Sequence, residues 1–141
     1  MKIVAISLMF MACRPVPDHW EPYNIPKQQS SYKKIKCRIT YYHPHQDKWG
    51  AKVACPKTKK AVEGLTVAAH PDFKFGQTVF IPELKGIIGD GHFTVQDRGS
   101  AVTKRTASKN QEYVFDVFVS NDQKMRNLAR VNSEYMNVYI K

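Results

Sequence analysis

Leu65-Thr-Val-Ala-Ala-His-Pro-Asp-Phe-Lys-Phe-Gly76 opens the stretch that decides the fold, and Tyr113-Val-Phe-Asp-Val-Phe-Val-Ser120 closes it. Between them lie Thr78-Val-Phe-Ile-Pro82 and Phe93-Thr-Val-Gln-Asp-Arg-Gly-Ser-Ala-Val102. Each segment is rich in β-branched and aromatic residues and ends at a polar or turn residue, which is the pattern of short strands. Glycines between the segments supply turns. The stretch therefore predicts a mainly β domain.

Two segments outside this stretch also alternate apolar and polar residues with the period of a half-buried strand, residues 33–42 and 135–140. Ser120-Asn-Asp-Gln123 resembles a capping box, and apolar residues follow it at helical spacing, so we expect one short helix there. Six or so short strands, one brief helix and many glycine turns predict a small β-barrel.

Composition limits the possible partners. The chain has 141 residues, 43% of them hydrophobic, which is enough for one globular domain. Its 22 Lys and Arg residues outnumber 12 Asp and Glu residues, giving a net charge of +10. This charge favours a polyanionic partner: nucleic acid, an anionic membrane face or a cell-wall polymer. A basic surface that serves only solubility is the alternative. No RNA- or DNA-binding motif is present, so nucleic acid is the least favoured partner.

The first 13 residues read as an export signal. One lysine precedes about ten apolar residues, too few to span a bilayer but typical of a secretory signal. The ending Phe10-Met-Ala-Cys13 resembles a lipobox, which predicts lipidation and membrane anchoring at Cys13. A simple export signal and an uncleaved strand or docking peptide are the alternatives. Residues 14–32 hold four prolines and predict an extended tether, so residues 33–141 form the domain.

If Cys13 is lipidated, Cys37 and Cys55 remain as a pair in an oxidising compartment. A disulfide between them is expected and would stabilise the fold by roughly 3 kcal/mol on chain-entropy grounds. Two unpaired buried thiols are the alternative. No cysteine or histidine spacing indicates zinc, and His43-Pro-His45 lacks further well-placed ligands. We therefore expect neither a metal nor a cofactor.

Two aspartates stand in apolar surroundings. Asp97 follows a β-like run at the start of a turn, and Asp116 lies between Phe115 and Val117 in the middle of another. Burial raises the pKa of a carboxyl group, and a raised pKa suits a general acid near neutral pH. The alternative is a structural role, with either aspartate paired to a nearby base: Arg98, Lys104 or Arg105.

A series of short motifs runs through residues 34–140: Thr40-x-Tyr42, Trp49-Gly50, Val67-Ala-Ala-x-Pro71, Phe75-Gly76, Val79-x-Ile81-Pro82, Val95-x-Asp97-x-Gly-Ser-Ala-Val102 and Phe115-Asp-Val-Phe-Val119. Together they resemble the three-aspartate (3D) domain family. That family is related to the catalytic domain of membrane-bound lytic transglycosylase A and, more remotely, to expansins and rare lipoprotein A. The resemblance implies a six-stranded double-psi β-barrel.

The resemblance also implies an activity, cleavage of the MurNAc-GlcNAc bond of peptidoglycan to give a 1,6-anhydro product. Asp97 and Asp116 match the second and third family aspartates, and the first falls on His70. Asp116 is then the expected acid/base and Asp97 its partner. Thr40, Tyr42, Trp49, His70 and Ser100 are the expected substrate-binding residues; for Trp49 a loop anchor is the alternative to a sugar-stacking platform. Residues 104–112 form an insertion between the two aspartates.

The leading hypothesis is therefore an exported cell-wall lytic enzyme that acts on peptidoglycan glycan strands. It would be periplasmic or anchored to the membrane as a lipoprotein, and a phage or its bacterial host would carry it, with virion association in the former case. The second hypothesis is a non-catalytic peptidoglycan-binding or structural module of an envelope or phage assembly, with protein partners there. Nucleic-acid binding is the third.

Overall fold

The computed structural model describes residues 31–141. The export signal, the lipidation of Cys13 and almost all of the predicted tether lie outside the described residues. Within residues 31–141, no helix is long and apolar enough to cross a membrane.

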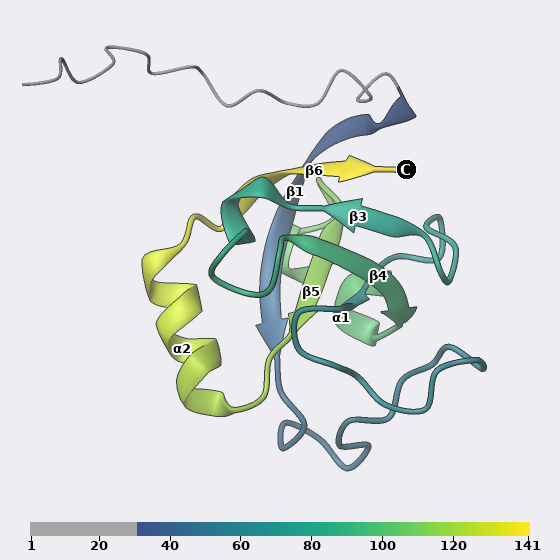
Figure 1. Ribbon diagram of the computed structural model, residues 1–141, viewed down its shortest axis with the longest axis vertical. Coiled ribbons are helices and arrows are strands. Elements are labelled where there is room, and N and C mark those ends of the chain that lie inside the picture. Colours follow the sequence, from purple (N-terminus) through teal and green to yellow (C-terminus); the bar gives the residue numbers. More distant parts are fainter. Residues whose placement is uncertain (1–30) are drawn as a thin grey trace, which may run out of the picture.

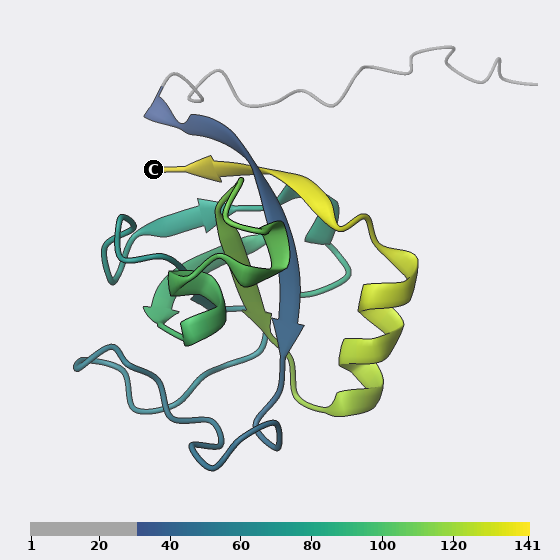
Figure 2. The same cartoon turned by 180° about the vertical axis from the view of Figure 1, so that it is seen from behind.

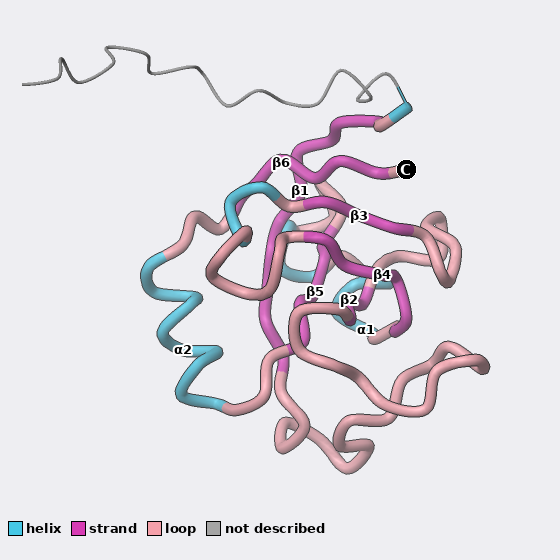
Figure 3. Tube along the Cα trace, in the orientation of Figure 1, coloured by secondary structure: helices cyan, strands magenta, loops and turns pink. Residues whose placement is uncertain are grey.

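Six strands form a closed barrel in the order β1-β5-β2-β4-β3-β6 (Figure 1). Their bounds are β1 (Lys33–Tyr42), β2 (Thr66–Ala68), β3 (Thr78–Phe80), β4 (His92–Asp97), β5 (Val114–Phe118) and β6 (Tyr135–Ile140). The helical elements are η2 (Pro82–Leu84), α1 (Ser100–Thr103), η3 (Thr106–Ser108) and α2 (Asp122–Val131). Long loops gather at one end of the barrel, and α2 lies along its side (Figure 3).

The pairing pattern is that of a double-psi barrel. Two pairs are parallel, β1 with β5 and β2 with β4, and the other four pairs are antiparallel. When each strand number is raised by three, with β6 followed by β1, the β1–β5 and β2–β4 pairs exchange, as do the β1–β6 and β3–β4 pairs. The β2–β5 and β3–β6 pairs map onto themselves. The barrel therefore has an internal twofold relation between β1 to β3 and β4 to β6, and the predicted fold class is confirmed.

Strand β1 follows the predicted alternation. Cys37, Ile39 and Tyr41 are buried in the core, whereas the residues between them point outward. The same core takes Phe93 and Val95 from β4 and Phe115 and Val117 from β5. Fully buried apolar side chains each contribute roughly 1.5–3 kcal/mol, so this interior supplies the main stabilisation of the barrel.

The predicted disulfide is wrong, because Cys37 and Cys55 are both free and buried. Cys37 faces the core from β1, whereas Cys55 lies in the loop beside β4, where its amide donates to the Gln96 carbonyl at 2.9 Å. Two strands, β5 and β2, separate β1 from β4 in the barrel. Burial, together with the charge of Glu112, raises the pKa of the Cys37 thiol to about 12.

Helix α2 forms where the sequence predicts it, but a different residue caps it. The cap is Asn121, whose side-chain Oδ1 accepts from the Lys124 amide at 2.9 Å. The Ser120 amide instead donates to Glu63 Oε2 at 2.6 Å. Met125 and Leu128 pack the helix against the core. The predicted capping box from Ser120 is thus displaced by one residue.

The two candidate caps give a direct comparison. We expect Asn121→Ala to lower the free energy of unfolding by ~1 kcal/mol, because an amide of the first turn loses its acceptor. Ser120→Ala keeps the bond from the Ser120 amide to Glu63 and the bond from the Lys124 amide to Asn121, and it loses only the long bond that Asn121 Nδ2 donates to Ser120 Oγ at 3.4 Å. It should therefore change stability by less than half as much. Urea unfolding of both variants checks this, and an equal or larger loss for Ser120→Ala would contradict the assignment.

Candidate active site

The two aspartates lie in one row of residues on the outer surface of the barrel. The strand registers pair Thr40 on β1 with Asp116 on β5, Asp116 with Ala68 on β2, and Ala68 with Asp97 on β4. Adjacent strands lie about 4.8 Å apart, so the two aspartate backbones are separated by roughly 10 Å. Only the methyl group of Ala68 stands between them in the row. The carboxylates can therefore act on one bound molecule.

A β-bulge turns Asp97 outward. In the pairing of β2 with β4, Val67 lies opposite Val95, and the next residue, Ala68, lies opposite Asp97. Gln96 therefore has no partner in β2 and is an extra residue in β4. Phe93 and Val95 point into the core, and strict alternation would send Asp97 there too. The extra residue reverses this alternation, which is a known effect of bulges next to functional sites. Asp97 consequently shares the outer face with Asp116.

Three donors converge on the Asp97 carboxylate. Its Oδ1 accepts from the amides of Ala54 at 2.9 Å and Arg98 at 2.8 Å, and its Oδ2 accepts from the Tyr42 hydroxyl at 3.0 Å. The residue is only 8% exposed, because the loop that carries Ala54 covers it. This arrangement suits a carboxylate that accepts hydrogen bonds and does not donate one. Asp97 is thereby fixed in position.

Asp116 has a different environment. Its Oδ1 accepts one hydrogen bond, from the Thr40 hydroxyl at 2.8 Å. Burial raises the pKa of Asp116, the Thr40 hydrogen bond opposes this rise, and the negative charge of Asp97 adds to it, so that the pKa is about 6. A carboxyl group with such a pKa holds a proton at mildly acidic pH and releases it near neutrality. The two aspartates thus differ in their hydrogen-bond partners, with three donors at Asp97 and one at Asp116.

Both aspartates open onto a pocket of about 670 Å³. Of the predicted substrate-binding residues, Tyr42, Trp49 and Ser100 line this pocket, whereas Thr40 does not line it but donates a hydrogen bond to Asp116, which does. Trp49 is 61% exposed, so it does not anchor its loop in the core. Its ring lies 5.0 Å from the Lys48 ammonium group. The site therefore combines two carboxylates with an accessible aromatic surface.

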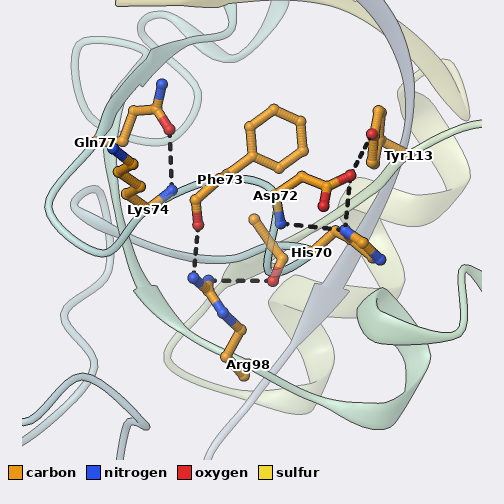
Figure 4. Close-up of polar contacts among 8 residues, drawn as sticks. His70, Asp72, Phe73, Lys74, Gln77, Arg98 and Tyr113 are labelled. Atoms are coloured by element: carbon orange, nitrogen blue, oxygen red, sulfur yellow. Dashed lines mark hydrogen bonds and ion pairs between the residues drawn. The ribbon is translucent and has the colours of Figure 1, made fainter.

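His70 lies outside this pocket. Its Nδ1 is 3.2 Å from Asp72 Oδ2, which also accepts from the Tyr113 hydroxyl at 2.5 Å. Figure 4 shows these three side chains meeting as a group, with the His70 ring beside Tyr113 at a centroid separation of 5.5 Å. The structure therefore separates His70 from the other predicted site residues. A histidine at this position removes no group from the pocket.

The nearest cation does not pair with either carboxylate. The Arg98 guanidinium donates to the Phe73 carbonyl at 2.6 Å (Figure 4) and to the carbonyls of Ala69 and Asp97 at 3.2 and 3.0 Å. It also lies over the Phe75 ring. Within residues 31–141, no ion pair joins Asp97 or Asp116 to a basic side chain. No structural salt bridge to Arg98, Lys104 or Arg105 therefore forms in the described part of the chain, although the charge of Asp97 opposes the lowering of the Arg98 pKa by burial.

Sequence reasoning missed several parts of the site. The hydrogen bonds from the backbone amides of Ala54 and Arg98 could not be predicted from residue type, because every residue except proline has a backbone N–H group. The sequence presents Ala68 only as part of a motif, although its small side chain leaves the space between the carboxylates. Lys52 and His43 also line the pocket.

In the described part of the chain, no three His, Cys, Asp or Glu residues are grouped to hold a metal ion.

Comparison with known proteins adds no relative. No protein-family model matches the chain, and no curated protein matches it significantly. The resemblance to the 3D domain family accordingly rests on the short motifs alone.

The raised pKa of Asp116 predicts a pH-dependent stability. Because the folded-state pKa of about 6 exceeds the ordinary value of 3.8, the unfolded chain ionises first as pH rises. The folded state therefore loses up to ~3 kcal/mol between pH 4 and pH 7 through this residue. We expect Asp116→Asn to gain stability over the wild type as pH rises through this window, in urea unfolding at several pH values.

Asp72→Asn is the matched control, because the contribution of Asp72 to stability has the opposite pH dependence. The hydrogen bond from Tyr113 is the main cause that lowers the pKa of Asp72. Its contribution to stability is present above the ordinary carboxyl pKa and is lost as pH falls. Stability curves of wild type and Asp116→Asn that run parallel from pH 4 to pH 7 would contradict the assignment.

Proposed function

We propose that the chain is a lytic transglycosylase-like enzyme that cleaves the MurNAc-GlcNAc bonds of peptidoglycan. The observation that supports this best is the row across β1, β5, β2 and β4. In this row Asp116 and Asp97 lie on either side of Ala68. Asp116 has a pKa of about 6, and Asp97 accepts three hydrogen bonds. Two carboxyl groups whose environments differ in this way suit the division between acid/base and charge stabiliser.

In the proposed reaction, Asp116 donates its proton to the glycosidic oxygen as the bond from that oxygen to C1 of MurNAc breaks. The ring gains oxocarbenium character, which the Asp97 carboxylate stabilises by its charge. The C6 hydroxyl of the same sugar then forms a bond to C1, and its proton returns to Asp116. Because the nucleophile belongs to the substrate, the carboxylate spacing rules for attack by water or by the enzyme do not apply.

The remaining pocket residues fit a glycan substrate. Trp49 presents an exposed ring on which a sugar can stack, and Lys52 adds positive charge toward the carboxylates of the wall polymer. The Thr40 hydroxyl occupies Asp116 Oδ1, which leaves Oδ2 to carry the transferred proton. Export through residues 1–13, with anchoring at Cys13, belongs to this proposal, because the substrate lies outside the cytoplasm.

The alternative, a non-catalytic peptidoglycan-binding or envelope module, was suggested by His70 in place of the first family aspartate. Since His70 belongs to the Asp72 and Tyr113 group and not to the pocket, its identity does not weigh against catalysis. Both carboxylates that the reaction needs are retained. The enzymatic hypothesis therefore stays ahead of the binding module.

Digestion of purified sacculi by the full chain, with mass spectrometry of the products, tests the proposal. We expect 1,6-anhydro-muropeptides from the wild type and a loss of at least about a hundredfold in Asp116→Asn and Asp97→Asn, which remove the acid and the charge. Asp72→Asn lies outside the pocket and should retain activity. If the folded wild type sediments with sacculi but releases no product, the chain is a binding module and the proposal fails.

A further inference from the structure

The barrel carries a second row of outward-facing residues on its other side. The registers pair Lys34 on β1 with Tyr139 on β6, Tyr139 with Phe80 on β3, and Phe80 with His92 on β4. We call the row of Thr40, Asp116, Ala68 and Asp97 the carboxylate row. The second row crosses the same number of strands and shares β1 and β4 with it. It joins one lysine to three rings across the sheet.

Side chains in this row contact one another. The Lys34 ammonium lies 5.8 Å from the centre of the Tyr139 ring, and the Tyr139 and Phe80 centroids are 6.3 Å apart. Phe80 and His92 stack with centroids 4.4 Å apart and planes 23° from parallel. These contacts hold the rings as one continuous strip, so little conformational entropy remains to be lost when a ligand binds.

The neighbouring positions extend the same chemistry. The Lys36 ammonium lies 5.6 Å and the Arg38 guanidinium 5.3 Å from the centre of the Tyr135 ring. Lys34, Lys36 and Tyr135 are exposed. We call this surface the cationic-aromatic face; its residues are Lys34, Lys36, Phe80, His92, Tyr135 and Tyr139. Three acidic residues border it: Glu134 paired with Arg38, Asp90 beside His92, and Glu83, which accepts from the Asn137 amide at 3.4 Å on β6.

The barrel topology puts this face opposite the candidate active site. In the closed order β1-β5-β2-β4-β3-β6, β5 and β2 form the centre of the carboxylate row, and β3 and β6 lie diametrically across the barrel. The two views agree, because β3 faces the viewer in Figure 1 whereas the green helical turns around α1 do so in Figure 2. One polymer segment in the pocket therefore does not also cover the cationic-aromatic face.

We propose that the cationic-aromatic face binds a second, anionic glycan strand. This proposal rests on the proposed function, since the wall polymer combines sugar rings with carboxylates. Lys34 and Lys36 would pair with the carboxylates, and the rings of Tyr135 and Tyr139 would contact the apolar faces of the sugars. The net charge of +10 complements such a polymer.

Local geometry favours a glycan over a single-stranded nucleic acid. Nucleic acid binds best to rings on which successive bases stack separately, within a groove of uniform positive charge. Here Phe80 and His92 already stack on each other, and Glu134 and Asp90 interrupt the positive charge. A polymer with sparser charge and saturated rings tolerates both features.

Binding at this face would hold the enzyme on an insoluble mesh. Peptidoglycan presents many strands, so one strand can occupy the cationic-aromatic face while another enters the pocket. Attachment to the first raises the effective concentration of the second. The face thus affects action on sacculi but not the bond-breaking step itself.

Co-sedimentation of the full chain with purified sacculi tests this inference. All proteins carry Asp116→Asn, so that cleavage does not remove the ligand. We expect the double variant Lys34→Gln and Lys36→Gln, and separately Tyr139→Ala, to bind about tenfold more weakly. The double variant Lys74→Gln and Lys104→Gln removes equal charge elsewhere and should bind as the parent does. Thermal melting confirms that each variant is folded.

Two further measurements separate this inference from the proposed function. In the otherwise wild-type chain, Lys34→Gln with Lys36→Gln should cleave a short soluble glycan at the normal rate and sacculi more slowly. If neither the wild type nor any variant cleaves peptidoglycan, the co-sedimentation comparison still tests whether the cationic-aromatic face binds the glycan. Unchanged sacculus binding by both face variants would overturn the inference, as would tighter binding of an oligothymidylate that the same substitutions abolish.

Discussion

The candidate site depends on one extra residue in β4. Gln96 interrupts the alternation that sends Phe93 and Val95 into the core, and so brings Asp97 to the outer face opposite Ala68. Without the bulge, Asp97 would point into an apolar interior, where an ionised carboxylate costs several kcal/mol. With it, the carboxylate reaches the Tyr42 hydroxyl and two amides. The chemistry of the surface is thus set by backbone register.

That register also explains why the two carboxyl groups differ. Asp97 sits at a strand end, where the amide of Arg98 and the loop amide of Ala54 are free to donate. Asp116 lies in the middle of β5, where the strand amides are already engaged in the sheet, so only Thr40 is available. The resulting burial raises the pKa of Asp116 and destabilises the fold near neutral pH, a cost that the apolar core offsets.

Much of the fold could be predicted from the sequence, since the alternation in β1 and β6 and the helical spacing after Ser120 each report a local preference. The motifs predict the grouping of Asp97 with Asp116, Tyr42, Trp49 and Ser100, which line one pocket. The outward direction of Asp97 could not be derived, because a bulge has no unique sequence signature. The Cys37–Cys55 pairing failed because it depends on which strands lie between β1 and β4, a long-range property of the topology.

The barrel has two outer faces on opposite sides, and the sequence has made them chemically opposite. One carries carboxylates on β5 and β4, and the other carries lysines on β1 and rings on β6, β3 and β4. The proposed acid/base role of Asp116 depends on its raised pKa, and titration of the Asp116 carboxyl carbon followed by NMR tests this most directly. A midpoint near pH 6 that falls in Asp97→Asn is the expected result. A midpoint at the ordinary value of 3.8, unmoved by that substitution, would contradict the account.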